Sequence, residues 1–428
     1  MQKIKIGLMG FGTVGSGIWK IIRENKDRIM ENCGYELEIS KILVKDIGKK
    51  RDESVDSRLF TDNPMDVLED SDIEIIVEVI GGIDPAKDYI LKAIQNKKHI
   101  VTANKALLAA HGEEIIKAAK EAKVEMYYEA SVAGGIPIIH ALKESLSANK
   151  IHSILGILNG TTNYILTKMA AENTDFETAL KEAQRLGYAE ADPTSDVEGY
   201  DAAYKLAILA GLAFGIAVDG NNVYREGISS ITPMDIEYAR ELGFTIKLLA
   251  IAKEVQGEVE LKVHPTFVPQ KHPLAAVGDA YNAVYVKGNA VGELMFYGKG
   301  AGDLPTGSAV VGDIISIIRK KEYIGHSQIA ISKNNKRIKP MSENQAEYYI
   351  RIIVKDYPGV LGRIASIFGK YKVSLSSVIQ KGKEEPSVSL VFITHSTTEN
   401  DVQNALNEIR MIPEMINVAN IIRVEKMD

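Results

Sequence analysis

A glycine-rich segment near the start of the chain, GFGTVG at residues 10–15, most constrains the fold. It lies between a short apolar run, residues 3–9, and a segment with helical spacing of apolar residues, 13–30. A dinucleotide-binding turn needs this strand–turn–helix context, because the helix start offers free N–H groups to a pyrophosphate. Gly10 would allow the tight turn, Gly12 the approach of the phosphates and Gly15 close packing of helix on strand. The alternative is a glycine-rich turn that binds no ligand.

The first third of the chain alternates almost continuous apolar strands with helices. We expect further strands at 36–44, 73–80, 99–102 and 124–130, and further helices at 85–96 and 112–122. Apolar strands separated by helices indicate a parallel sheet that is covered on both faces. Residues 1–134 are therefore predicted to form an α/β Rossmann nucleotide-binding domain.

Three more regions follow. Residues 135–306 mix helices with strands and predict an α+β substrate-binding domain, after which a helix at 307–320 is expected to return to the first domain. Residues 321–345 are polar and predict a linker. Residues 346–428 show the order β-α-β-β-α-β, which is typical of ferredoxin-like domains.

Composition excludes several classes of function. The formal net charge of −6 makes a nucleic-acid partner unexpected, and no apolar run is long enough to cross a bilayer. The single cysteine, Cys33, allows no intrachain disulfide and indicates a reducing cytoplasm. The first residues run directly into a strand and show no signal peptide, and the histidines show no spacing typical of a transition-metal centre.

The segment after the second expected strand bears on cofactor choice. An NAD site usually has an acid there for the ribose 2′-hydroxyl. This chain has Lys45 and then Asp46, followed by Lys49, Lys50 and Arg51. Positive charge suits a 2′-phosphate, so we predict NADP, with NAD as the other option. A basic surface loop with no such role is the alternative.

Lysines and acids mark a candidate catalytic site. Lys105 follows the end of a strand, where open α/β sheets bind ligands, although a surface lysine at a helix start is an equal alternative. Asp201 and Lys205 are four residues apart on an apolar helix, so the lysine could act as a general acid or base. Glu190 or Asp196 could bind a substrate ammonium. An ordinary surface ion pair between Asp201 and Lys205 is the alternative.

Six segments together resemble the homoserine dehydrogenase family over about residues 3–320: GFGTVG, TANKALLA, YEASVAGGIPII, GILNGTTNYIL, GYAEADPTSDVEGYDAAYKLAILA and GAGDLPTG. The resemblance implies an NAD(P)-dependent oxidoreductase that interconverts aspartate 4-semialdehyde and homoserine in the biosynthesis of threonine, methionine and isoleucine. It also implies that the α+β domain is catalytic and dimerises, so a homodimer or homotetramer is expected.

The resemblance also assigns residues. It implies that Lys205 exchanges the proton of the substrate oxygen and that Lys105 is a second active-site lysine. The substrate-binding acids would be Glu190 and Asp201. The cofactor loops would contain Phe11, Thr13, Val14 and, in a second glycine-rich loop, Gly302. Many members carry two acids where this chain has Ser195-Asp196, which leaves open the role of the first of these two acids.

Two further loops resemble binding elements. In the family, backbone oxygens at positions matching Glu129, Val132, Gly134 and Ile136 bind Na⁺ or K⁺, whereas the alternative is a turn without an ion. The DxPGxL loop of ACT domains binds amino acids, and here it would use Asp356, Gly359, Val360 and Leu361. In this family the ACT domain is associated with threonine inhibition. An ACT domain that only dimerises is the alternative.

Two rival functions remain open at this stage. A phosphorylating semialdehyde dehydrogenase would need a cysteine nucleophile, and Cys33 follows the first helix, away from the expected site. A non-catalytic sensor could bind a dinucleotide and an amino acid, but the intact acid–lysine segment favours an enzyme.

Overall fold

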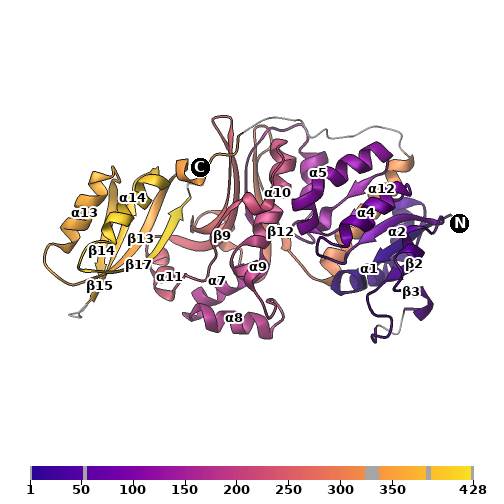
Figure 1. The fold of residues 1–428 in the computed structure, drawn as a ribbon, viewed down its shortest axis with the longest axis horizontal. Coiled ribbons are helices and arrows are strands. Elements are labelled where there is room, and N and C mark those ends of the chain that lie inside the picture. Colours follow the sequence, from indigo (N-terminus) through magenta and orange to yellow (C-terminus); the bar gives the residue numbers. More distant parts are fainter. Residues whose placement is uncertain (1, 52–54, 323–336, 382–386, 426–428) are drawn as a thin grey trace. The chain divides into compact units, whose positions relative to one another are not determined.

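The computed structural model describes residues 2–51, 55–322, 337–381 and 387–425, which form two compact units. Unit 1 consists of Met1–Ile154, Ala203–Val223 and Tyr281–Asn335, and unit 2 of Leu155–Ala202, Tyr224–Ala280 and Lys336–Asp428. Figure 1 shows the chain coloured along its sequence. Most of the expected linker, 323–336, lies outside the described residues.

A parallel sheet of six strands forms the centre of unit 1, in the order β3-β2-β1-β4-β5-β6. The strands are β1 (Lys3–Met9), β2 (Glu36–Leu43), β3 (Phe60–Thr61), β4 (Ile73–Glu78), β5 (His99–Thr102) and β6 (Met126–Tyr127). Strand order reverses between β1 and β4, which is where open α/β sheets bind ligands. The prediction of a Rossmann domain is confirmed.

Helices cover both faces of this sheet. They are α1 (Thr13–Glu24), α2 (Lys26–Cys33), α3 (Met65–Leu68), α4 (Ala86–Gln95), α5 (Lys105–Ala122) and α12 (Asp303–Glu322). One apolar core contains Ile18 of α1 and Ile314 of α12, and the other contains Ile90 of α4 and Ile115 of α5. The continuous apolar runs of the sequence are explained by this burial on two sides.

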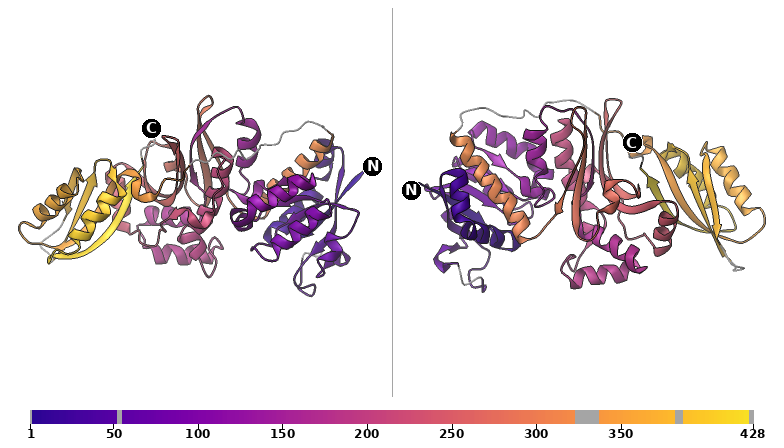
Figure 2. Two further views of the ribbon diagram at one scale, coloured as in Figure 1. Left: turned by 45° about the horizontal axis from the view of Figure 1, so that its top comes forward. Right: turned by 180° about the vertical axis from the view of Figure 1, so that it is seen from behind.

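Helix α12 returns from late in the chain to pack on α1, as Figure 2 shows from behind. The two helices approach so closely at Gly17 that a Cβ atom there would lie 2.1 Å from the Asp303 carbonyl oxygen. Gly307 of α12 lies against Gly17 in turn. Only glycine permits this contact, because a side chain would displace one backbone from the other.

Three expected elements differ in unit 1. The helix expected over 13–30 breaks at Asn25, which ends α1 and precedes α2. Helix α5 begins at Lys105, earlier than expected, because the Asn104 side chain accepts a hydrogen bond from the Leu107 N–H at 3.1 Å. The strand expected over 124–130 shrinks to β6, because the chain turns at Tyr128 into a short 3₁₀-helix, Glu129–Ser131.

The other elements of the catalytic region include an antiparallel hairpin in unit 1, formed by β11 (Tyr281–Gly288) and β12 (Gly292–Lys299). Unit 1 also contains α6 (Ile138–His140). Two elements have residues in both units, β7 (Ile151–Ile157) and α10 (Tyr200–Phe214). Unit 2 contains α7 (Gly160–Glu172), α8 (Phe176–Arg185), α9 (Thr194–Val197), β8 (Tyr224–Arg225) and α11 (Pro233–Glu241).

In unit 2 one sheet joins catalytic and C-terminal strands. The long hairpin β9 (Phe244–Val255) and β10 (Glu258–Pro269) is followed in the sheet by β17 (Met415–Val424) and β13 (Gln345–Lys355). Strands β10 and β17 pair in parallel through Thr266 with Arg423 and Phe267 with Val424. The sequence did not predict β9, whose inner residues are buried on both faces.

The C-terminal region has the predicted β-α-β-β-α-β order. Beside β13 and β17 it contains α13 (Val360–Lys370), β14 (Leu375–Lys381), β15 (Ser387–Thr394), a short β16 (Thr397–Thr398) and α14 (Glu399–Ile409). Ile364 of α13 and Leu406 of α14 share one core with Ile350 of β13. Among the described residues, no helix has the length and apolar character required to span a membrane.

Buried charge joins the C-terminal strands to the rest of unit 2. The fully enclosed Asp235 carboxylate, at the start of α11, accepts from Arg351 Nε at 2.8 Å and from the Tyr349 hydroxyl at 3.0 Å, both on β13. It also accepts from Asn420 of β17 at 2.8 Å and from the Thr232 N–H at 3.0 Å. Burial opposes ionisation, but the Arg351 guanidinium and the Thr232 donors outweigh it and hold the pKa of Asp235 below its usual value.

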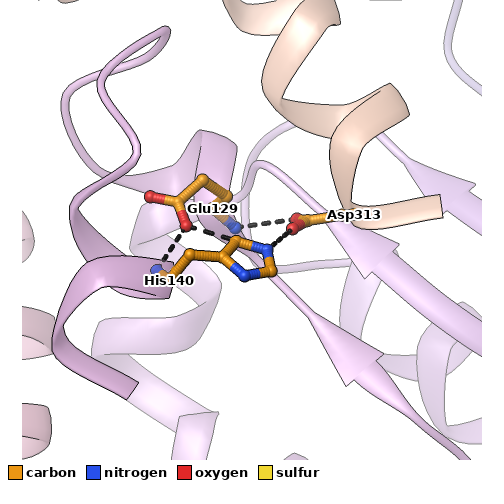
Figure 3. Close-up of side chains that lie close together, drawn as sticks. All are labelled: Glu129, His140 and Asp313. Carbon is orange, nitrogen blue, oxygen red and sulfur yellow. Dashed lines mark hydrogen bonds and ion pairs between the residues drawn. The ribbon is translucent and has the colours of Figure 1, made fainter. Parts of the chain in front are cut away.

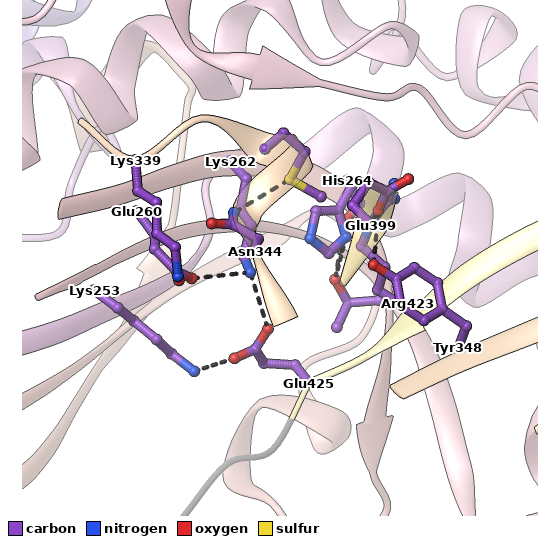
Figure 4. Close-up of polar contacts among 12 residues, drawn as sticks. Lys253, Glu260, Lys262, His264, Lys339, Asn344, Tyr348, Glu399, Arg423 and Glu425 are labelled. Atoms are coloured by element: carbon purple, nitrogen blue, oxygen red, sulfur yellow. Dashed lines mark hydrogen bonds and ion pairs between the residues drawn. The ribbon is translucent and has the colours of Figure 1, made fainter. Parts of the chain in front are cut away.

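Arg423 of β17 makes the second buried connection, and Figure 4 shows this arginine beside Glu399 of α14. Its guanidinium is 1% exposed and donates to Glu226 Oε2 at 2.7 Å and to Glu399 Oε2 at 2.8 Å. In the same region Lys253 of β9 pairs with Glu425. These pairs require the C-terminal sheet to stay docked on β10, because separation would leave buried charges without counter-charges.

Substitution of Asp235 tests this connection. In D235N the buried Arg351 loses its counter-charge, so we expect the free energy of unfolding to fall by about 3–5 kcal/mol. Chemical denaturation measures this loss. D56N removes the exposed partner of Arg58 and should leave the denaturation midpoint unchanged. Equal midpoints for D235N and the wild type would contradict the expectation.

The same pair should make stability depend on pH. Because the pKa of Asp235 is depressed in the fold, its contribution is complete above the pKa of an unfolded aspartate, about 3.9. The contribution is lost as the pH falls through the lower pKa of the folded state. The loss of stability on acidification should therefore be shallower in D235N than in the wild type.

Candidate active site and cofactor site

The turn after β1 has the geometry of a phosphate-binding loop. Gly10 has a φ of +106°, and a Cβ atom there would lie 2.8 Å from the Val79 carbonyl oxygen. A Cβ at Gly15 would lie 2.3 Å from the Gly10 oxygen, whereas one at Gly12 would meet no atom within 4 Å. Gly12 is also the N-cap of α1 and provides no side-chain hydrogen bond. The helix start therefore has space and N–H donors for a pyrophosphate.

The remaining residues of this turn lie toward β3 and the core. Thr13 is the first residue of α1, and Val14 packs against the core that α1 shares with α12. The Phe11 ring contacts the edge of the Phe60 ring, with centroids 5.4 Å apart. The Arg51 guanidinium lies 5.1 Å from the Phe60 centroid on its face. The turn is thus joined to the basic loop that follows β2.

That basic loop presents lysines rather than an acid. The Asp46 carboxylate accepts the Gly48 N–H at 2.8 Å, and Arg51 donates to the Asp46 carbonyl oxygen at 2.6 Å. Asp46 therefore stabilises its own turn. The Lys45 side chain is exposed at the C-terminal end of β2, the position that recognises the adenosine ribose in Rossmann domains.

A buried acid orders the loops after β4 and β5. Glu78 ends β4 and accepts from the Ile80 N–H at 2.9 Å and from the Thr102 hydroxyl at 2.6 Å. Burial raises the pKa of Glu78, and these hydrogen bonds oppose the rise. Asn104 donates to the Gly82 carbonyl oxygen at 2.6 Å and caps α5, whose first residue is Lys105. Lys105 is thereby placed at the strand ends that carry the Gly10 turn. Sequence reasoning missed Glu78, although an acid that ends a β-branched run was a usable signal.

Lys205 lies in unit 1, as do Lys105 and the Gly10 turn. The residue is only 8% exposed, one helical turn after Asp201 on α10. Its neighbour Tyr204 packs on Gly220, where a Cβ would lie 2.5 Å from the Tyr204 ring and 3.3 Å from Ala109 of α5. This part of α10 is therefore close to the helix that starts at Lys105, and Lys205 is a buried lysine rather than a surface one.

Two of the predicted substrate acids meet in unit 2. Asp196 of α9 and Asp201, which is 4% exposed, both accept hydrogen bonds from the Asn159 amide nitrogen, at 2.7 and 3.0 Å. The Glu190 side chain is exposed, and its backbone oxygen accepts from Gln184 at 3.0 Å. Sequence reasoning quoted the segment that contains Asn159 but gave this residue no role.

The loop expected to bind a monovalent cation turns sharply and is buried. Ala133 and Gly134 have φ values of +54° and +52°, and all residues from Glu129 to Ile136 except Gly135 are buried. The Ile136 carbonyl oxygen accepts the Ile138 N–H at 2.8 Å, which leaves its second lone pair for another partner. A buried loop that turns back in this way suits coordination of Na⁺ or K⁺ by backbone oxygens.

Three side chains fasten this loop to α12, as Figure 3 shows. The Glu129 carboxylate accepts from the backbone N–H groups of Ile139 at 2.8 Å and His140 at 2.6 Å. Asp313 of α12 accepts the Glu129 N–H at 2.8 Å, and its other oxygen lies 3.0 Å from His140 Nε2. Glu129, His140 and Asp313 have potential ligand atoms within 4.8 Å of one another. In the described part of the chain they form the one group of three His, Cys, Asp or Glu residues that is close enough to bind a metal ion.

The charges in this group are coupled. Burial, with a smaller effect of Asp313, raises the pKa of Glu129 to about 7, although the N–H groups of His140 and Ile139 oppose it. The hydrogen bond to Asp313 raises the pKa of His140. Each carboxylate oxygen already accepts a hydrogen bond, so these side chains hold the predicted cation loop in place. The sequence could not reveal it, since Glu129 and Asp313 are 184 residues apart.

The second glycine-rich loop, which contains Gly302, packs on the predicted cation loop. Gly302 has a φ of +125° and directly precedes α12. The Gly135 N–H donates to the Lys299 carbonyl oxygen at 3.1 Å. A Cβ at Gly134 would lie 2.4 Å from the Gly300 oxygen, so glycine is required there. The predicted cation and cofactor loops are therefore in direct backbone contact.

The predicted effector loop begins α13. Asp356 is exposed, and Gly359 is the N-cap of α13 with a φ of +89°. Val360 is buried and Leu361 is at the surface. A helix start with an N-cap that lacks a side chain suits a carboxylate, as the DxPGxL resemblance requires.

Comparison with known families assigns almost the whole chain. Residues 10–129 match the NAD-binding domain of homoserine dehydrogenase, 137–315 match homoserine dehydrogenase, and 348–414 match the ACT domain. A homoserine dehydrogenase of Bacillus subtilis is 45% identical over 99% of both chains. The chain belongs to the homoserine dehydrogenase family.

Solved structures agree with this family. A homoserine dehydrogenase from Thiobacillus denitrificans superposes with a TM-score of 0.94 at 42% identity and covers 100% of this chain and 99% of its own. A homoserine dehydrogenase of S. aureus gives a TM-score of 0.78 at 38% identity, with 99% of each chain covered. A hyperthermophilic archaeal homoserine dehydrogenase in complex with NADPH covers 74% of this chain and 98% of its own, with a TM-score of 0.63 at 29% identity. The resemblance seen in the sequence and the three-part fold are confirmed.

Two glycine substitutions separate cofactor binding from folding. G12A places a methyl group in open space, so the melting temperature should be unchanged while the dissociation constant for the cofactor rises about tenfold or more. G15A places it against the Gly10 oxygen and should lower the melting temperature. Thermal unfolding and cofactor titration measure both effects. Unchanged cofactor affinity in a well-folded G12A would show that the turn does not bind the phosphates.

Proposed function

We propose that this protein is an NAD(P)-dependent homoserine dehydrogenase that reversibly reduces L-aspartate 4-semialdehyde to L-homoserine. The observation that carries the proposal is the burial of Lys205 and Asp201, one helical turn apart within the family's acidic segment. An ordinary surface ion pair, the alternative interpretation of this spacing, is inconsistent with that burial.

The dinucleotide supplies the hydride that the aldehyde carbon accepts. Lys205 holds the proton that the former carbonyl oxygen takes up, and in the reverse direction it removes this proton from the homoserine hydroxyl. Asp201, Asp196 and Glu190 are proposed to bind the substrate ammonium, and Lys105 to orient the substrate beside the cofactor. A lysine and carboxylates fixed before substrate arrives reduce the reorganisation that the reaction would otherwise require.

We further propose a preference for NADP over NAD. The exposed Lys45 at the end of β2 suits a 2′-phosphate, and the neighbouring Asp46 accepts a hydrogen bond within its own turn. The archaeal relative in complex with NADPH is consistent with this preference.

The remaining roles are proposed on the family likeness and the geometry above. Backbone oxygens of Glu129, Val132, Gly134 and Ile136 would bind Na⁺ or K⁺ and stiffen the loop beneath Gly302. The α13 start, with Asp356, Gly359, Val360 and Leu361, would bind threonine and mediate feedback inhibition. A homodimer or homotetramer working in threonine, methionine and isoleucine biosynthesis in the cytoplasm completes the proposal.

Replacement of Lys205 tests the catalytic role. K205A should lower kcat about 100-fold or more, the usual contribution of a general acid, while the affinity for the cofactor stays within twofold. K98A is a matched control, because Lys98 is also buried in unit 1 but donates to the backbone oxygens of Asp70 and Ile73. It should reduce stability and retain kcat. Near-normal turnover of K205A would refute the role.

An initial-rate assay tests specificity and regulation together. We expect homoserine-dependent reduction of both cofactors, with the higher kcat/KM for NADP, and a lower rate when threonine is added. Absence of turnover with either cofactor would refute the proposed function. Equal rates with and without threonine would leave the enzyme assignment intact and refute the effector.

A further inference from the structure

We infer that Asn159 is a positioning residue of the active site, which holds Asp196 and Asp201 together as one ammonium-binding pair. The inference rests on the proposed function, since it concerns two of the acids that are proposed there to bind the substrate ammonium. Asn159 itself need not touch the substrate, because it acts through the two carboxylates.

The contacts of Asn159 use both ends of its amide. The residue is buried just before α7, and its nitrogen donates to Asp196 Oδ1 at 2.7 Å and Asp201 Oδ2 at 3.0 Å. An amide nitrogen carries two hydrogens, so one is available for each carboxylate. Its oxygen accepts the Thr162 N–H at 2.8 Å and thereby caps α7.

The orientation of the amide is fixed by its neighbours. A flipped Asn159 would turn its oxygen toward two carboxylates and its NH₂ group toward the Thr162 N–H, which would lose the hydrogen bonds on both sides. The helix cap and the carboxylate bridge therefore depend on each other. Because α7 is anchored at this end, the nitrogen is held where α9 and α10 converge.

The amide of Asn159 lies between two carboxylates that would otherwise repel each other. Two carboxylates that reach the same nitrogen atom repel each other, and a donor that binds both of them opposes this repulsion. A neutral donor holds both oxygens in place and adds no positive charge to the pair. A substrate ammonium then finds two acids at a fixed separation, which favours binding of an amino acid over a neutral alcohol.

Two substitutions separate the bridge from the helix cap. N159S keeps an oxygen that can cap α7 but removes the NH₂ group. N159D also keeps the cap and adds a third carboxylate. N163D is the matched control, because Asn163 is a buried amide one turn later on α7 that donates to the carbonyl oxygens of Val277, Gly278 and Asp279.

Steady-state kinetics of homoserine oxidation provide the test. We expect KM for homoserine to rise at least tenfold in N159S and N159D, with KM for the cofactor and the melting temperature close to wild type. N163D should keep KM for homoserine within twofold. Normal KM for homoserine in both Asn159 variants overturns the inference while the proposed function stands. A wild-type protein without homoserine-dependent turnover overturns both.

A double-substitution cycle with D196N tests whether Asn159 acts through Asp196. A purely structural residue would change KM for homoserine by the same factor with and without D196N. If Asn159 acts through Asp196, N159S should raise KM for homoserine much less in the D196N background than in the wild type. Equal fold-changes in the two backgrounds overturn the inference. The cycle also applies if N159D folds poorly, because it needs only N159S and D196N.

Discussion

The Asp235 carboxylate is fully enclosed, and its donors come from segments that lie 116 and 185 residues further along the chain. A charge in that position is tolerated only when hydrogen bonds and a counter-charge replace water. The fold of unit 2 depends on this requirement, because β13 and β17 must dock beside α11 before Arg351 and Asn420 can reach the acid. The ACT strands are therefore built into the sheet that continues from β9 and β10.

The same requirement shapes the loops of unit 1. Glu78 is buried and orders the segments after β4 and β5, so that the first turn of α5 presents Lys105 at the sheet edge. Glu129 and Asp313 accept N–H groups of the predicted cation loop and its neighbours and so order this loop. The loop in turn contacts the glycine-rich segment that contains Gly302. Loops that would otherwise be mobile become rigid because buried carboxylates use their N–H groups.

Asn159 fixes the proposed substrate acids in a similar way, through hydrogen bonds to buried carboxylates. There a neutral amide donates to both carboxylates and adds no charge of its own. Lys205, the proposed catalytic lysine, is buried on an apolar helix. A site with these two properties can bind an amino acid and exchange a proton with its hydroxyl without moving its own groups far.

The sequence by itself determined the elements whose signals are local. Alternating strands and helices predicted the Rossmann sheet, glycine spacing predicted the turn after β1, and the C-terminal order predicted the ferredoxin-like domain. Tertiary structure alone decided that residues 129–131 leave the sheet, that β9 exists and that the returning helix α12, which the sequence predicted, meets α1 at Gly17. It also placed Asn159 between Asp196 and Asp201 and His140 beside Asp313, and it left Glu190 exposed. The physical reason is that periodicity reports which side of an element is buried, whereas the partner of a buried polar group is chosen by packing between segments far apart in the chain.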